Sequence, residues 1–228
     1  MSLVIFDLDN TLIADDSDYL WGQFLVEQGI VDSHDYARAN DKFYEDYKHG
    51  QLDIVEFLNF SLKPLAENDA EQLFEWRQQF ITQKIQPILL PAAQKLIAHH
   101  KQQGDTLLII TATNRFITEP IALLYGIESL IATTPELKQG QFTGNFIGIP
   151  SFQEGKVKLL QEWLGDFPQL SLQDSWFYSD SHNDLPLLKL VTNPVAVDPD
   201  DKLNAYALEQ GWQIISLREE VCATHHLK

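Results

Sequence analysis

The sequence predicts an α/β fold, with a doubly wound, Rossmann-like parallel sheet as the core and a helical cap domain inserted near the N-terminus. Three observations support this prediction. From Pro91 onward, short apolar strands alternate with amphipathic helices, as in a doubly wound sheet. An apolar run at residues 4–12 has the pattern of one more buried strand. Between them, residues 15–88 contain helix-length segments and no convincing strand.

The first predicted strand, VIFDLDNTL at residues 4–12, ends in two aspartates. Side chains two positions apart on a strand point the same way, so Asp7 and Asp9 should share one face where the strand stops. Two carboxylates placed so close together repel each other unless a cation compensates. A turn with a helix cap at residues 9–11 is the alternative interpretation.

The insertion is rich in aromatic residues, which are Tyr19, Trp21, Phe24, Phe43, Tyr44, Tyr47, Phe57, Phe60, Phe74, Trp76 and Phe80. We expect most of them to form its own core rather than a ligand site. Pro64 and Pro87 mark expected helix boundaries. The predicted domains are therefore a catalytic core of residues 1–14 and 89–228 and a helical cap of residues 15–88.

The alternating part of the chain begins with a predicted helix at residues 92–101, a strand at 106–113 and a helix at 119–125. The further predicted strands are SLIAT (129–133), SWFYSDS (175–181), NPVAVD (193–198) and WQIIS (212–216). Residues 138–146 place two glycines among strand formers, which predicts a peripheral hairpin.

Composition excludes several classes of partner. The 228 residues carry 33 acidic and 16 basic side chains, a formal net charge of −17, so we expect no nucleic acid and no membrane surface as a partner. No apolar run has the length of a membrane span, and no basic leader precedes the first strand. The single cysteine, Cys222, excludes a disulfide framework. These features predict a cytoplasmic protein.

Polar residues follow several of the predicted strands, where ligands bind in open α/β sheets. Asp180 and Asp184 follow an apolar strand, and with Asp7 they make an oxygen-rich pocket of the kind that Mg²⁺ prefers. A phosphate beside these carboxylates needs donors, which Thr111 and the N–H groups after it could supply together with Lys156. Taken alone, a lysine at a helix start is usually solvated.

Four ordered motifs resemble those of the haloacid dehalogenase-like phosphatases. They are DLDNT (7–11), IITAT (109–113), GK (155–156) and SDSHND (179–184). The resemblance implies a phosphatase in which Asp7 is the nucleophile and forms an aspartyl-phosphate. It also implies that Asp9 is the general acid and base, which protonates the leaving alcohol and then activates water.

The resemblance further implies how the remaining residues act. The expected metal site is Mg²⁺ held by the Asp7 carboxylate, the Asp9 main-chain carbonyl and Asp180, with Asp184 in support. The expected phosphate-binding residues are Thr111, Ala112 and Lys156, and Lys156 should also keep Asp7 ionised.

The insertion resembles the cap of the phosphoserine phosphatase-like branch, which selects the leaving group. Asp16 stands where these enzymes have an acidic residue for the substrate amine, and Asp15 or Asp18 could hold the amine together with it. Asn59 stands where they have an arginine for the substrate carboxylate, and an amide carries no charge for that task. We therefore predict an amine-bearing substrate without a carboxylate, with histidinol phosphate as the best guess. Trp21, Tyr19 or Phe43 could pack against its ring, and Asn183 is a further expected contact.

Arg115 keeps a second substrate open, because it could bind a carboxylate if it enters the site, and phosphoserine would then fit. Other classes of function are phosphoryl transfer to another alcohol and a non-catalytic binding protein with the same fold. A receiver domain would be about half as long and would lack the insertion. The predicted partner is a small phosphate ester, with no prediction of oligomeric state.

Overall fold

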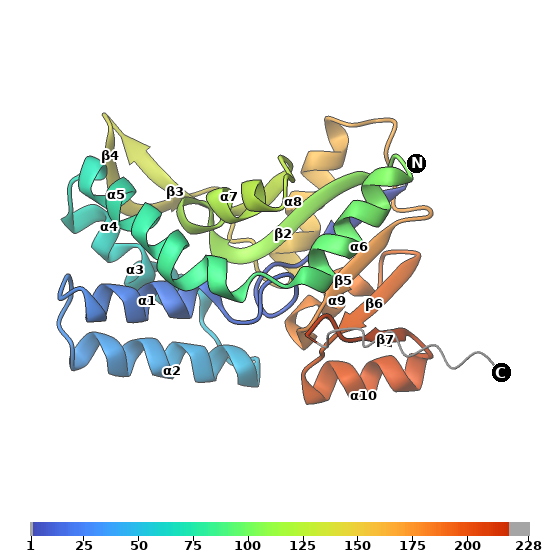
Figure 1. The fold of residues 1–228 in the computed structure, drawn as a ribbon, viewed down its shortest axis with the longest axis horizontal. Helices are drawn as coiled ribbons and strands as arrows, with labels where there is room; N and C mark the ends of the chain where they lie inside the picture. Colours follow the sequence, from blue (N-terminus) through green and yellow to red (C-terminus); the bar gives the residue numbers. More distant parts are fainter. Residues whose placement is uncertain (1, 219–228) are drawn as a thin grey trace.

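The computed structural model describes residues 2–218, so Cys222 lies outside the described residues. Its centre is a seven-stranded sheet in the order β4-β3-β2-β1-β5-β6-β7 (Figure 1). The strands are Leu3–Phe6 (β1), Thr106–Asn114 (β2), Leu130–Lys138 (β3), Gln141–Ile147 (β4), Trp176–Ser179 (β5), Asn193–Val197 (β6) and Gln213–Ile215 (β7). Every pair is parallel except β3 with β4. The predicted α/β fold is confirmed.

Helices cover both faces of this sheet. They are Pro91–Gln102 (α6), Arg115–Leu124 (α7), Glu154–Gly165 (α8), His182–Asp184 (η3), Leu185–Leu188 (α9) and Asp201–Gln210 (α10). In β1, Val4 and Phe6 join one apolar cluster while Leu3 and Ile5 join another, and all four are at most 1% exposed. An unbroken apolar run is therefore what a central strand covered on both faces requires.

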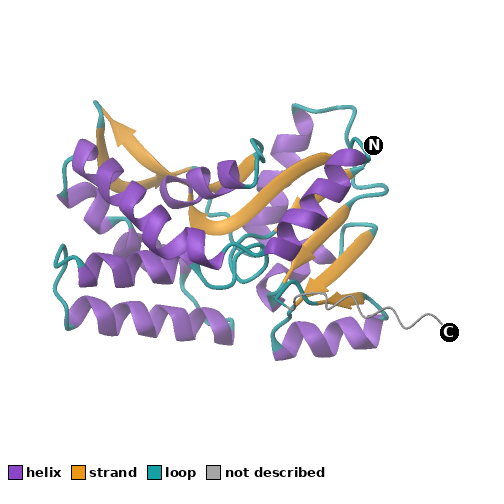
Figure 2. Ribbon diagram, viewed as in Figure 1, coloured by secondary structure: helices purple, strands orange, loops and turns teal. Residues whose placement is uncertain are grey.

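The insertion is helical throughout (Figure 2). Its elements are Ser17–Glu27 (α1), Asp35–His49 (α2), Ile54–Ser61 (α3), Lys63–Glu67 (α4), Ala70–Phe80 (α5), Ile81–Ile85 (η1, a π-helix) and Gln86–Ile88 (η2, a 3₁₀-helix). Its two connections to the sheet run side by side, since Ala14 donates to the Ile88 carbonyl and Ile13 forms a bridge with Leu89. These contacts lie at the expected domain boundaries.

An aromatic cluster joins the insertion to the core. The Trp21 ring of α1 lies 5.2 Å from Phe80 of α5 and 5.9 Å from Phe116 of α7. Phe24 packs 5.5 Å from Trp21. These four side chains belong to the same buried cluster as one face of the sheet. The apolar interior of the inserted helices is therefore continuous with that of the core.

Helix α7 begins at Arg115, earlier than the predicted Glu119, and runs through Pro120. Proline has no N–H, so the carbonyl of Phe116, four residues before it, loses its helical partner. Arg77 of α5 donates a hydrogen bond to that carbonyl at 2.9 Å. A side chain from the insertion thus compensates for the proline, which no local pattern in the α7 sequence could indicate.

The predicted hairpin at residues 138–146 exists as β3 and β4, but the expectation that it is peripheral is wrong. The Phe142 ring packs 5.3 Å from Phe116. A Cβ added to Gly144 would lie 3.2 Å from the Cβ of Ala66 in α4. Strand β4 therefore supports the inserted helices.

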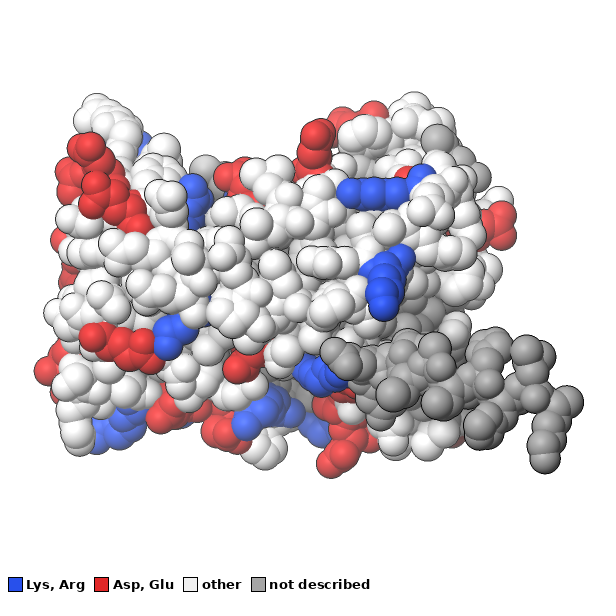
Figure 3. All heavy atoms as spheres, viewed as in Figure 1, with Lys and Arg blue, Asp and Glu red and all other residues white. Residues whose placement is uncertain are grey.

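None of the helices within residues 2–218 combines the length and the apolar character that crossing a bilayer requires. Acidic and basic side chains are interspersed over the face shown in Figure 3, and neither kind forms a continuous area there.

The continuous aromatic core predicts a large difference between two phenylalanines of the insertion. Phe24 is fully buried and Phe74 is 45% exposed. Phe24→Ala should lower the free energy of unfolding by about 3–5 kcal/mol, because it leaves a cavity among packed rings. Phe74→Ala, the matched control, should cost about 1.5 kcal/mol or less. Urea denaturation measures both, and equal losses would contradict a shared core at Phe24.

Candidate active site

The turn after β1 places the first motif at the carboxyl end of the sheet. The Asp7 N–H still pairs with the carbonyl of Tyr178 in β5, at 2.9 Å, and the chain then folds back on itself. The Leu12 N–H donates to the Leu8 carbonyl at 2.8 Å, and Asn10 has a left-handed φ of 55°. Asparagine tolerates that conformation better than most residues do. Asp7 and Asp9 therefore both stand at the strand end.

Lys156 lies between two carboxylates. It is 2% exposed, and its Nζ lies 2.8 Å from Asp7 Oδ1 and 2.7 Å from Asp184 Oδ1. Burial alone would lower the pKa of Lys156, but Asp184 and Asp7 outweigh it and raise that pKa, so the ammonium stays charged. Ser179 donates a further hydrogen bond to Asp184 at 2.8 Å. The structure thus brings the third and fourth motifs to Asp7.

A glycine lets the lysine turn inward. Lys156 occupies the first turn of α8, just after Gln153, which has a φ of 47°. A Cβ added to Gly155 would lie only 2.0 Å from the carbonyl oxygen of Pro150. The GK pair is therefore a packing requirement, because only glycine permits the close backbone approach that aims Lys156 at Asp7.

Asp9 is held by three donors. Its Oδ1 accepts the Ser17 N–H at 2.7 Å, and its Oδ2 accepts the hydroxyls of Thr111 at 3.1 Å and Thr113 at 2.9 Å. Thr111 and Thr113 are two apart on β2, so both face this carboxylate. In this arrangement the Thr111 hydroxyl positions Asp9. The role of Thr111 in binding phosphate stays a prediction.

Asp180 is tied to the first motif through Thr11. The Thr11 hydroxyl donates to Asp180 Oδ1 at 3.0 Å and accepts the Asp180 N–H at 3.1 Å. Burial, and after it the charges of Asp7 and Asp184, raise the pKa of Asp180 well above its usual range. Burial also raises the pKa of Asp7 to about 7, although Lys156 opposes that shift. These carboxylates carry more negative charge than one lysine balances.

The donor set fits a hard divalent cation. Within residues 2–218 no three His, Cys, Asp or Glu side chains converge as a metal site by themselves. Two carboxylates, Asp7 and Asp180, leave room for a main-chain oxygen such as that of Asp9, and for water and phosphate, which suits Mg²⁺. The oxygens of Asp184 already accept hydrogen bonds from Lys156 and Ser179. The support that we expect Asp184 to give the metal would therefore act through Lys156.

A pocket opens above these groups, between the sheet and the inserted helices. It is lined by Asp7, Asp9, Asp16, Asp18, Tyr19, Asn40, Phe43, Tyr44, Tyr47, Leu52, Ile54, Phe57, Thr111, Ala112 and Thr113. No Lys or Arg is among these described lining residues. The pocket is acidic on the side of the sheet and largely aromatic or apolar on the side of α2 and α3.

Two aspartates of α1 complete the acidic side. Asp16 caps the helix by accepting the Tyr19 N–H at 2.8 Å. Asp18 is 7% exposed, and its Oδ2 is buried without a hydrogen-bond partner among the described residues. Burial, followed by the charge of Asp9, raises the pKa of Asp18 to about 7, and the same two causes raise the pKa of Asp16 well above its usual range. A cationic ligand group would relieve both shifts.

Four residues expected near the substrate lie elsewhere, two of them in the insertion and two in the core. Trp21 is buried among the aromatic rings that join the insertion to the core, and it does not line the pocket. Asn59 is exposed, since α3 directs Ile54 and Phe57 to the pocket and leaves Asn59 off that face.

Arg115 also stays out of the pocket. It donates to the Leu130 carbonyl at 2.6 Å and pairs with Glu119 at 3.7 Å. Asn183 is 3% exposed and bridges two other residues. It donates to the Tyr47 carbonyl and accepts from Gln153, each at 3.1 Å. Asn183 thus contacts the insertion rather than the pocket wall.

Several site residues were missed by reasoning from the sequence. They are Thr11, Ser17, Asn40, Tyr47, Leu52, Ile54, Phe57, Thr113 and Ser179. The strand period could have indicated Thr113, two positions after Thr111. The DLDNT motif already contained Thr11. Ser17 acts through its backbone N–H, which leaves no signal in the side-chain pattern.

A family model described as haloacid dehalogenase-like hydrolase matches residues 4–189. The chain belongs to this family. It is 45% identical over 220 residues to a histidinol-phosphatase of Neisseria meningitidis, which covers 95% of this chain and 99% of that protein. It is 28% identical to the phosphoserine phosphatase SerB1 of Mycobacterium tuberculosis, over 93% of this chain and 70% of that one. These findings confirm the predicted family and enzyme class, a phosphatase.

Solved structures agree with this membership. A protein of unknown function from Bordetella pertussis superposes with a TM-score of 0.89 at 42% identity, over 95% of this chain and 98% of that one. A substrate-bound phosphoserine phosphatase superposes with a TM-score of 0.69 at 17% identity, over 96% and 94%. At that identity the second likeness supports the fold alone.

The ion pairs of Lys156 predict a stability change that depends on pH. In the metal-free protein, Lys156→Met should lower the free energy of unfolding by about 3–5 kcal/mol, because it leaves buried carboxylates unpaired. Removing the cation that lowers the pKa of Asp7 raises that pKa further above its unfolded value. A carboxyl with a raised pKa binds its proton more tightly when folded, so stability falls as pH rises.

The deficit of Lys156→Met relative to wild type should therefore be larger at pH 8 than at pH 5.5, in denaturant titrations with EDTA. Lys158→Met on the exposed side of the same helix is the matched control and should change stability by about 0.5 kcal/mol or less. A deficit that is independent of pH would contradict the assigned pairing.

Proposed function

We propose that this phosphatase hydrolyses the phosphate ester of a small amine-bearing metabolite, with histidinol phosphate as the best candidate. One observation carries the proposal. The unpartnered, buried oxygen of Asp18 lies with Asp16 in the pocket that also contains Asp7. A buried carboxylate without a partner is costly unless the ligand supplies a cation. A substrate with an ammonium group near its phosphate meets that requirement.

The rest of the pocket supports a substrate with a ring and without a carboxylate. Phe43 and Phe57 lie edge to face at 5.5 Å on the apolar side of the pocket, a surface on which an imidazole could pack. A carboxylate would require a positively charged partner, and none of the described lining residues supplies one. Phosphoserine is therefore the weaker candidate. The name of the Neisseria meningitidis relative agrees with this choice.

The proposed reaction has two steps. First, a carboxylate oxygen of Asp7 attacks phosphorus, the ester P–O bond breaks, and Asp9 gives its proton to the leaving alcohol. Second, Asp9 takes a proton from water as the water oxygen attacks phosphorus, and the bond from Asp7 to phosphorus breaks. Ester and water thus give alcohol and inorganic phosphate. Mg²⁺ bound by Asp7 and Asp180 would neutralise charge on the phosphoryl group.

A screen of phosphomonoesters with Mg²⁺ tests this function. Histidinol phosphate should give the highest kcat/KM, phosphoserine a lower one, and free phosphate should be the sole phosphorus product. Asp7→Asn should lower turnover at least a thousandfold while the protein stays folded, because the amide is nearly isosteric but is not a nucleophile. EDTA should abolish wild-type turnover and added Mg²⁺ should restore it.

Asp166→Asn, an exposed substitution at the end of α8, is the matched control for the change of charge and should leave turnover within twofold. Residual activity of Asp7→Asn within tenfold of wild type would remove Asp7 from the nucleophilic role. Transfer of phosphate to an added alcohol would identify a transferase instead.

The amine site has its own test. Asp16→Asn and Asp18→Asn should each lower kcat/KM for histidinol phosphate at least tenfold, because an amide cannot neutralise an ammonium group. Asparagine remains a good helix cap at position 16, so α1 should stay intact. Hydrolysis of para-nitrophenyl phosphate, which has no amine, should change less than threefold. Equal losses on both substrates would exclude an amine site at these residues.

A further inference from the structure

Hydrogen-bond donors are scarce around the proposed position of the phosphate. The Thr111 and Thr113 hydroxyls donate to Asp9, and Lys156 uses two of its three N–H donors for Asp7 and Asp184, which leaves its third N–H and the main-chain N–H groups after Thr111 for the phosphate. The surrounding aspartates offer acceptors only while they are ionised. A phosphoryl group has three non-bridging oxygens, so a donor beyond these residues would find a use in the site.

Tyr47 of α2 is a neutral donor at this position. It lines the pocket that contains Asp7 and Asp9, and it also lines a neighbouring pocket with Asp180. The two pockets that Tyr47 lines therefore place its side chain beside Asp7, Asp9 and Asp180. Unlike an aspartate, its hydroxyl is neutral and can donate a hydrogen bond.

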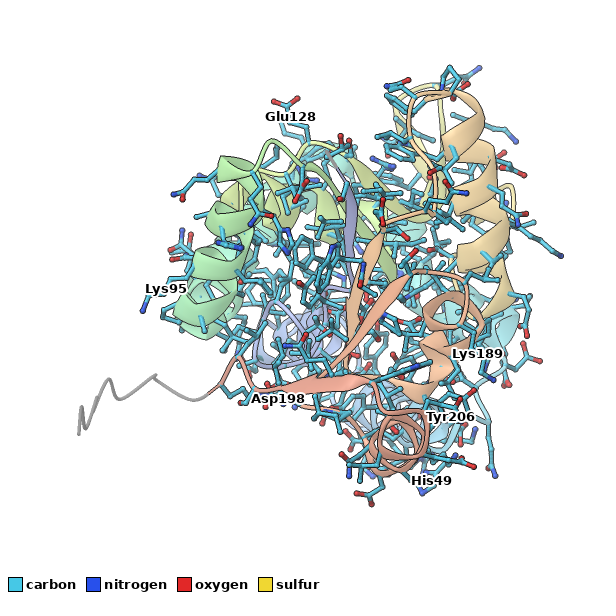
Figure 4. All side chains as sticks on the ribbon, turned by 90° about the vertical axis from the view of Figure 1, so that its right-hand side faces the viewer. His49, Lys95, Glu128, Lys189, Asp198 and Tyr206 are labelled. Atoms are coloured by element: carbon cyan, nitrogen blue, oxygen red, sulfur yellow. The ribbon has the colours of Figure 1, made fainter. Side chains whose placement is uncertain are left out.

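Core residues donate hydrogen bonds to the end of α2 that carries Tyr47. Asn183 donates to the Tyr47 carbonyl at 3.1 Å, and Lys202 of α10 donates to the His49 carbonyl at 2.8 Å. Figure 4 shows His49 beside α10. The bond from Lys202 satisfies a carbonyl that the last turn of a helix leaves free, and the bond from Asn183 adds to the Gly50 N–H that the Tyr47 carbonyl accepts at 3.0 Å. The position of Tyr47 is thus fixed by the core as well as by its own helix.

Helix α2 ends at a glycine, which allows a close contact with the core. Gly50 has a left-handed φ of 70°, and a Cβ added there would lie 2.6 Å from His182 Nε2. Glycine both ends the helix and lets its backbone approach the loop that follows β5. The Tyr47 ring packs 6.2 Å from Phe152, which precedes α8. Close packing on both sides leaves the tyrosine little freedom to move away from the site.

We propose that Tyr47 is a catalytic residue supplied by the inserted helices, whose hydroxyl donates a hydrogen bond to a non-bridging oxygen of the substrate phosphoryl group. The proposal rests on the function proposed above, in which that group is transferred to Asp7. No proton leaves Tyr47 in either step, because the hydroxyl only stabilises charge. The Tyr47 hydroxyl can reach the phosphate only while the end of α2 is in contact with the core. This contact and phosphate binding are therefore linked.

Tyr47→Phe tests this role, because it removes the hydroxyl and keeps the ring that packs on Phe152. The variant should lower kcat/KM roughly a hundredfold, the effect of losing one donor to a developing anion. The loss should be equal for para-nitrophenyl phosphate and for the best ester of the screen, since both share the phosphoryl group. The inhibition constant of inorganic phosphate should rise roughly tenfold. The melting temperature should stay within about 2 °C of wild type.

Tyr36→Phe is the matched control. Tyr36 lies on the same helix, with its ring 4.4 Å from Phe60, and it does not line the pocket. Removing the Tyr36 hydroxyl should leave kcat/KM and the inhibition constant of inorganic phosphate within twofold of wild type. A kcat/KM and a phosphate inhibition constant of Tyr47→Phe within twofold of wild type would overturn the proposal. A loss confined to the amine-bearing ester would also overturn it, because it would place Tyr47 at the leaving group.

Failure of the proposed function is distinguishable from failure of this proposal. If the wild-type protein hydrolyses no phosphomonoester, the proposed function is wrong. Calorimetric titration with inorganic phosphate and Mg²⁺ would then still compare wild type with Tyr47→Phe. A dissociation constant that is the same in both proteins would overturn the contact between Tyr47 and phosphate.

Discussion

The buried pairing of Lys156 with Asp7 and Asp184 is the interaction on which the site depends. It joins the loop after β1, the start of α8 and the end of the fourth motif. Burying three charges is costly, and their attraction offsets that cost only where the geometry is good and no charge is left alone. One ammonium cannot balance Asp7, Asp184 and the nearby Asp180. The remaining negative charge makes a cation part of the site's requirements.

The same excess of carboxylates relates catalysis to selectivity. In the proposed function, Asp7 and Asp180 on the sheet side hold a metal ion, while Asp16 and Asp18 on the insertion side hold the ammonium group of the ligand. Helix α1 begins at Ser17, ten residues after Asp7, so the two acidic groups are held close together by the chain itself. A substrate of the proposed kind would carry its phosphate and its amine a few bonds apart, which would limit its size.

Much of the core could be predicted because its signals are local. The unbroken apolar run of β1 and the aspartates that follow it predict both a central strand and its functional end. The orientation of the inserted helices could not be predicted. Placing Trp21 at the substrate assumed a helix rotation that the motif does not contain. Asn59 was placed by counting residues, but the face that α3 presents depends on Ile54 and Phe57. These outcomes depend on contacts between segments far apart in the sequence.

The two sides of the insertion are attached to the core by contacts of different physical character. On the side of α1 and α5, Trp21 and Phe80 pack against Phe116, and separating them would expose several large rings to water. At the end of α2, hydrogen bonds from Asn183 and Lys202 make the contact, and water can replace such bonds at a much smaller net cost. Opening the pocket therefore costs the least free energy at the end of α2, and the insertion would rotate about the aromatic cluster. A substrate admitted there would pass the aromatic wall before it reached the carboxylates.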